Sequence, residues 1–119
     1  MNNRISDTEL EVMQTLWEAG KPMSVQDVCD ALKNNKWKYR TVATLLIRME
    51  QKGAVVSQKQ GRLNLYSSVL DEEEYKKAQT KRFIGKLYKG SVKDLAVSLF
   101  KSDDMTEEDI EEIRRMFDL

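Results

Sequence analysis

Two arginines and two threonines recur at helical spacing between positions 40 and 48, and a stripe of Val, Leu and Met side chains falls on the opposite side. A guanidinium group can bridge the O6 and N7 acceptors of guanine, and a threonine can offer its hydroxyl or touch a thymine methyl group. An amphipathic helix with this polar face suits the major groove of DNA, whereas the simpler alternative is an ordinary solvated surface. The candidate base-reading residues are Arg40, Thr41, Thr44 and Arg48.

Positive charge gathers around this segment, although the chain as a whole has no net charge. Residues 1–70 contain ten Lys and Arg against seven Asp and Glu, and residues 71–119 contain ten against thirteen. From Lys36 to Arg62, seven basic residues face a single acidic one, Glu50. A local excess of positive charge favours a polyanionic partner. We expect four of these side chains to contact DNA phosphates: Lys38, Lys52, Lys59 and Arg62.

The residue types present argue against catalysis and against a metal or other cofactor. The chain has no histidine, so the usual general base at neutral pH is missing. Its one cysteine, Cys29, falls on the apolar side of a predicted helix, where a thiol behaves as a small hydrophobic group, and one cysteine cannot complete a zinc site. The acidic clusters at 72–74 and 107–109 begin predicted helices, where they favour the helix dipole. We expect no catalytic residue, no metal site and no cofactor.

Three short amphipathic helices should position the Arg and Thr face. Ser6 with Glu9 forms a capping-box pattern, and Gly20 is suited to the left-handed position that ends a helix. Ser24 can cap the next helix, and the Asn34–Lys36 stretch interrupts the apolar spacing. The predicted helices cover about 7–19, 24–33 and 38–52.

The apolar period changes after Gly53. The segments 54–60 and 63–69 are short, rich in Val, Leu, Ser and Tyr, and separated by Gly61-Arg62, which favours a β-hairpin. Three helices followed by a two-stranded hairpin is the order of a winged helix-turn-helix. We therefore predict a mainly α fold with a small β-hairpin, in which residues 1–70 form a winged-helix DNA-binding domain.

Residues 71–119 return to helical spacing in three short and strongly one-sided pieces. Such apolar stripes need a partner to cover them. Folding back on the first domain as a helical cap would serve, but helices from a second chain would bury them better. We predict a helical dimerisation module, with these candidate contact residues: Phe83, Leu87, Val92, Leu95, Leu99, Phe100, Ile110, Ile113 and Phe117.

Compartment and membrane signals are few. No apolar run approaches the roughly 18 residues needed to cross a bilayer, and no apolar signal segment follows Arg4. A single cysteine excludes an intrachain disulfide framework. We expect a cytoplasmic protein that makes no membrane contact of its own.

Several stretches, in this order, resemble the penicillinase and methicillin-resistance repressors and the related copper-responsive repressors. The resemblance covers nearly the whole chain. In the first domain it is carried by Ile5-Ser6-Asp7, Glu11-Val12-Met13, Leu16-Trp17, Arg40-Thr41-Val42, Thr44-Leu45-Leu46, Arg48-Met49 and Lys52-Gly53-Ala54; in the second, by the segment from Phe83 to Gly90 and by Ile110-Glu111-Glu112-Ile113.

The resemblance implies a winged-helix repressor that binds a palindromic, double-stranded DNA operator as a homodimer and controls β-lactam-resistance genes. It also implies a membrane-bound sensor protease that cleaves the C-terminal module and so releases the DNA. The family's scissile bond is usually Asn-Phe, and the matching pair here is Leu99-Phe100. Ala43 stands where the family often has a basic residue. The Cys-x-Cys motifs of the copper-responsive branch are absent.

Three other functions stay open at this point. A winged helix can regulate other genes without proteolytic induction, and it can serve as a protein-interaction module that never contacts DNA. Direct sensing of a small molecule is a third alternative, although the sequence offers no pocket signature. The seven-to-one basic bias between positions 36 and 62 favours DNA over a protein partner.

Overall fold

A computed structural model describes residues 5–32, 37–102 and 104–117; residues 116 and 117 are described through their backbone only. The chain divides into two compact units, residues 1–74 and 75–119. The division falls four residues after the domain boundary predicted from the sequence. The predicted helix break at Asn34–Lys36 lies outside the described residues.

Two capping boxes start the first two helices of the first unit. Helix α1 spans Asp7–Ala19, and the Ser6 hydroxyl accepts the Glu9 N–H while the Glu9 carboxylate accepts the Ser6 N–H. Gly20 ends this helix with φ 64°, in the left-handed region that glycine tolerates best. Helix α2 spans Val25–Ala31 and has the same reciprocal cap between Ser24 and Asp27. The capping box and left-handed glycine predicted for α1 are confirmed.

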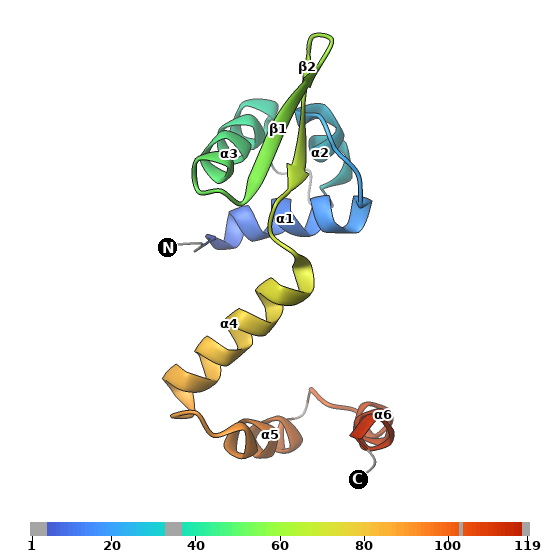
Figure 1. Ribbon diagram of the computed structural model, residues 1–119. Coiled ribbons are helices and arrows are strands. Elements are labelled where there is room, and N and C mark those ends of the chain that lie inside the picture. The colour runs from blue at the N-terminus through green and yellow to red at the C-terminus, as the bar shows by residue number, and fades with distance from the viewer. Residues whose placement is uncertain (1–4, 33–36, 103, 118–119) are drawn as a thin grey trace. The chain divides into compact units, whose positions relative to one another are not determined.

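Helix α3 spans Tyr39–Gln51 and precedes an antiparallel hairpin of β1, Val55–Gln60, and β2, Leu63–Ser68. The strand register pairs Val55 with Ser68 and Gln60 with Leu63, so the turn falls at positions 61 and 62. Figure 1 shows that this turn projects away from the three helices. At the base of the hairpin, Met23 pairs with Tyr66 through two backbone hydrogen bonds of 2.9 and 2.7 Å, which join the segment before α2 to β2.

One hydrophobic core holds this unit together. Helices α1, α2 and α3 contribute aliphatic and methionine side chains, and the hairpin contributes Val55 and Tyr66. The Trp17 indole N–H is 2.9 Å from both the Ser68 hydroxyl and the Leu70 carbonyl, which anchors the end of β2 to α1. Because the core takes one face of each helix, the opposite face of α3 is left at the surface. The remaining core residues are Val12, Met13, Leu16, Met23, Val28, Val42, Leu45, Leu46, Met49 and Ala54.

The C-terminal part of the chain forms α4, Glu72–Leu87, α5, Val92–Lys101, and α6, Glu107–Phe117. The Ser91 hydroxyl caps α5 through the Asp94 N–H, and Thr106 and Asp109 exchange hydrogen bonds at the start of α6. Neither α4 nor α5 contributes a buried side chain. No helix in the described ranges has the length and apolar character needed to span a bilayer. The prediction of a mainly helical fold with one small hairpin is confirmed.

Candidate nucleic-acid interface

Helix α3 carries the four candidate base-reading side chains on one exposed face. Arg40, Thr41, Thr44 and Arg48 are all exposed. On the other side of the helix, Val42, Leu45, Leu46 and Met49 are buried in the core. The helical spacing that predicts this division therefore holds through the whole of α3, and the structure brings the two arginines and two threonines together.

Thr44 lies at the centre of this face, and part of its hydrogen-bonding capacity is used inside the helix. Its hydroxyl donates to the Arg40 carbonyl at 2.9 Å. The hydroxyl oxygen can still accept a hydrogen bond, and the methyl group adds an apolar contact. A threonine bonded in this way is suited to accept from a base amino group or to touch a thymine methyl.

Three of the four candidate phosphate ligands are exposed at the edges of the same unit. Lys59 lies in β1 just before the hairpin turn, and Arg62 lies within the turn. Gly61 makes this turn possible with φ 64°. Lys38 is the N-cap residue of α3, and its side chain makes no capping hydrogen bond. Lys36, also part of the basic stretch, lies outside the described residues.

Lys52, the fourth candidate, is already engaged within the protein. Its ammonium nitrogen lies 2.6 Å from Oε1 of Glu9, whose side chain is 1% exposed. Although burial raises the pKa of Glu9, hydrogen bonds from Lys52 and from Ser6 outweigh it and hold that pKa below its usual value. The ion pair connects the first turn of α1 to the C-cap of α3. The sequence could not reveal it, because 43 positions separate the two residues.

Glu50, the single acidic residue of the basic stretch, also has an internal role. Its Oε2 accepts the Ser57 N–H at 3.0 Å and the Ser57 hydroxyl at 2.8 Å. These hydrogen bonds connect the last turn of α3 to β1. The role of the Glu50 carboxylate within the basic stretch is therefore structural, because it fixes the hairpin relative to the exposed face of α3.

Ile47 is a residue of this surface that the sequence analysis missed. Its side chain is 52% exposed, on the same side of α3 as the arginines and threonines. The available signal was its position, since Ile47 falls outside the stripe formed by Val42, Leu46 and Met49. Ala43, where the family often has a basic residue, is half-buried.

The candidate dimerisation residues of α4 and α5 are accessible. Phe83, Leu99 and Phe100 are close to half exposed, Leu87 and Val92 are each 65% exposed, and Leu95 is half-buried. In α6, Ile110 and Ile113 are half-buried. Phe117 ends α6, but its side chain lies outside the described part.

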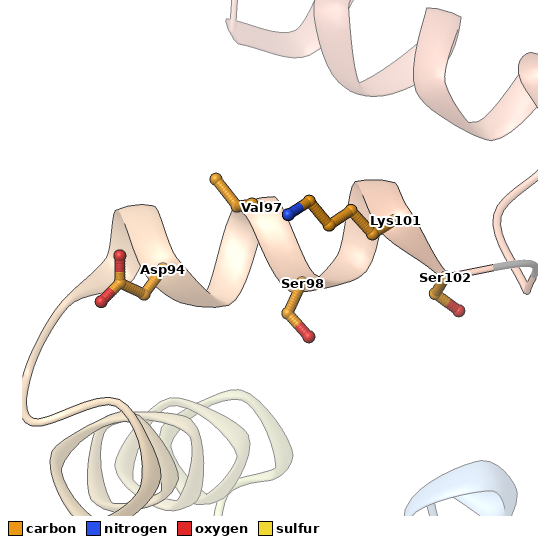
Figure 2. A pocket seen from close by; sticks show the side chains of 5 residues that line it. All are labelled: Asp94, Val97, Ser98, Lys101 and Ser102. Atoms are coloured by element: carbon orange, nitrogen blue, oxygen red, sulfur yellow. The ribbon is translucent and has the colours of Figure 1, made fainter.

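A shallow hollow lies beside α5. Figure 2 shows the five side chains that line it, and all of them come from α5 or its C-cap. No other described element contributes a second wall to this hollow, so it does not enclose a small molecule. Its lining residues are Asp94, Val97, Ser98, Lys101 and Ser102.

The described residues contain no group of three or more acidic, cysteine or histidine side chains that could hold a metal ion. Cys29 is half-buried and packs against the core of the first unit. Burial, followed by the charge of Asp30, raises the pKa of its thiol. A thiol in this setting is less reactive than a free one.

The chain is similar to known repressors over most of its length. Residues 5–118 match the penicillinase repressor family. The penicillinase repressor of Bacillus licheniformis is 28% identical over 97% of this chain and 90% of its own. The methicillin resistance regulatory protein MecI of Staphylococcus aureus (strain N315) is 31% identical over 94% of this chain and 91% of its own.

A solved structure agrees with these relatives. The Bacillus licheniformis repressor BlaI, as a monomeric form in complex with the blaP half-operator, is 36% identical to this chain. It superposes with a TM-score of 0.51 over 60% of this chain and 88% of the BlaI chain. The winged-helix fold, the exposed basic face of α3 and the family match over residues 5–118 agree. This chain belongs to the penicillinase repressor family, a family of DNA-binding transcriptional repressors and not of enzymes.

Proposed function

We propose that this chain binds a palindromic DNA operator as a homodimer and represses the genes beside it. The observation that carries this proposal is the joint exposure of Arg40, Thr41, Thr44 and Arg48 on one face of α3. BlaI, which shares the fold, is known in complex with a half-operator. A helix with such a face reads base edges in the major groove, because only that groove is wide enough to admit it.

The phosphate contacts come from the edges of this face. Lys38 lies at the start of α3, Lys59 lies just before the hairpin turn and Arg62 lies within it, so both α3 and the hairpin offer positive charge to a duplex. Lys52 differs from these three, because its ammonium group is held by the buried Glu9. We assign Lys52 to the support of α3 and leave it out of the phosphate contacts.

The homodimer is supported by the apolar side chains of the second unit. Five of these side chains expose apolar surface that contributes no hydrophobic stabilisation while it faces water. Burying that surface against a second chain is favourable. The five are Phe83, Leu87, Val92, Leu99 and Phe100. Two linked domains bind two half-sites with a joint affinity that exceeds either alone. We expect half-site centres about 10 bp apart, or a multiple of that spacing, on one face of the duplex.

Resistance to β-lactams is the proposed regulated trait, supported by the names of the relatives. Relief of repression is proposed to follow cleavage of Leu99-Phe100 by a membrane-bound sensor protease. Both residues lie in α5, close to half exposed. A cut there would divide the second unit and remove the bivalency that holds two half-sites.

Footprinting of the DNA upstream of the encoding gene tests the repressor proposal. The expected result is protection of two symmetric half-sites, with an affinity that falls steeply as salt rises because counterions are released. Binding that is absent, or insensitive to salt, contradicts the proposal and favours a protein-interaction module.

Immunoblotting of cells treated with a β-lactam tests the proteolytic step separately. The expected result is a fragment ending at Leu99 that accumulates as the target genes are derepressed. Derepression with only full-length protein present contradicts cleavage but leaves the DNA-binding proposal standing.

A further inference from the structure

The polar face of α3 contains one large aliphatic side chain. All residues of α3 are described, and among its aliphatic side chains of Val size or larger only Ile47 is exposed, at 52%. Val42, Leu46 and Met49 are fully buried in the core, and Ile47 is not among the side chains that pack against it. An isoleucine half in water gives the folded chain little of the free energy that a buried one gives.

Ile47 lies within the candidate base-reading face and not beside it. Successive residues of an α-helix are separated by about 100° around its axis. With Thr44 at the centre, Arg40 and Arg48 lie about 40° to either side, and Thr41 and Ile47 about 60° to either side. Ile47 therefore flanks Thr44 on one side as Thr41 does on the other.

The hydrogen bonds between α3 and the hairpin do not involve Ile47. Glu50, one turn further along α3, contacts β1 through its hydrogen bonds to Ser57. By the same helical geometry, Glu50 lies about 60° beyond Ile47, on the side of the helix that faces the hairpin. The contact between α3 and β1 thus leaves Ile47 turned outward.

We propose that Ile47 is a specificity-determining residue that packs on the C5 methyl group of a thymine in the operator. That methyl is the apolar group that A·T pairs present in the major groove, whereas the other base-edge groups there donate or accept hydrogen bonds. A branched hydrocarbon side chain cannot pair with a phosphate or a base amide, so a thymine methyl is the partner that its chemistry selects. The inference rests on the proposed function, because it requires α3 to enter the major groove.

Replacing single thymines of the protected half-site by deoxyuridine tests this inference, since the exchange removes only the methyl group. Each oligonucleotide is titrated with the full-length protein at one fixed salt concentration. Wild type is expected to lose about fourfold in affinity at the thymine that Ile47 contacts, the loss that corresponds to one methyl group left unburied. Ile47→Ala is expected to bind the thymine and deoxyuridine operators equally.

Val56→Ala is the matched control, because Val56 is a branched aliphatic residue that is 50% exposed and lies on β1, outside the base-reading face of α3. This variant should keep the full fourfold preference for thymine. Wild-type binding that is unchanged by deoxyuridine at every position overturns the inference, as does an Ile47→Ala variant that keeps the preference. Failure of wild type to bind any upstream fragment contradicts the proposed function itself, and the inference falls with it.

Discussion

The candidate DNA-binding side chains form two groups, those on the exposed face of α3 and those at the start of α3 and on the hairpin. Arg40, Thr41, Thr44 and Arg48 project from a helix whose other side is fixed in the core, so the backbone that carries them is in place before any ligand arrives. Lys38, Lys59 and Arg62 are exposed, and such long flexible side chains suit the non-directional attraction of phosphates. The first group should determine sequence preference, and the second should determine affinity for any duplex.

Lys59→Ala tests the role of the second group. Loss of one phosphate contact should weaken binding to operator and to unrelated DNA alike, and should lower the slope of log affinity against log salt by about one. Titrations of both DNAs at several salt concentrations measure this. A loss confined to the operator, with the slope unchanged, would mean that Lys59 reads a base.

Ile47 shows how residue type alone can mislead at this scale. Arginine and threonine can be recognised from the sequence as candidate hydrogen-bonding residues, but an isoleucine on a helix is ordinarily assigned to the core. The exposure of Ile47 follows from its angular position relative to Val42 and Met49, and the structure makes that position explicit.

At the scale of elements, most of the first unit follows from local sequence signals. The reciprocal caps of Ser6 with Glu9 and of Ser24 with Asp27, and the left-handed Gly20, are decided by neighbours within four positions. The connections between elements are not local. The contacts of Trp17 with Ser68 and Leu70, and of Glu9 with Lys52, join residues more than 40 positions apart, and no periodicity encodes them.

The Glu9–Lys52 ion pair is the connection with the clearest energetic consequence. Lys52→Met keeps the aliphatic stem but leaves a buried carboxylate without its partner, at a cost of about 2 kcal/mol, since Lys52 is one-third exposed and solvent screens part of the pair. Urea denaturation at pH 7 measures this loss. Lys59→Ala, which removes an exposed charge, should change stability by less than about 0.5 kcal/mol.

The same pair predicts a pH dependence. The folded-state pKa of Glu9 is lowered. The contribution of its carboxylate to the free energy of unfolding is therefore complete above the unfolded-state pKa, and it is lost as pH falls through the folded-state pKa. The stability difference between wild type and Lys52→Met should therefore shrink as acid protonates Glu9. A difference that stays constant down to the pH at which the protein unfolds would assign the effect to packing of the lysine stem.

At the scale of the whole molecule, the proposed function depends on joining two DNA-binding units through the second unit. The one-sided apolar pattern of α4 to α6 predicts that surface, and the exposure of Leu87 and Val92 supports it. A single sequence leaves open which face of each helix meets the partner, because that depends on a second chain.

Leu99→Asp tests the dimer. A carboxylate in an apolar interface should shift the protein to the monomer and lower operator affinity about 100-fold through lost bivalency. Ser98→Asp adds the same charge one position away, at an exposed residue, and should leave the dimer intact. Analytical ultracentrifugation at micromolar concentration distinguishes the two variants. A wild-type monomer, or a Leu99→Asp dimer, would contradict the assignment.

The most direct test of the base-reading role of α3 compares two double variants that each remove two positive charges. Arg40→Ala/Arg48→Ala changes the exposed face of α3, and Lys93→Ala/Lys101→Ala changes exposed residues of α5. Affinity for the operator and for a scrambled duplex is measured at one salt concentration. The α3 variant should lose at least about tenfold of its preference for the operator, and the α5 variant should keep it. Equal operator preference in both variants would contradict the central claim.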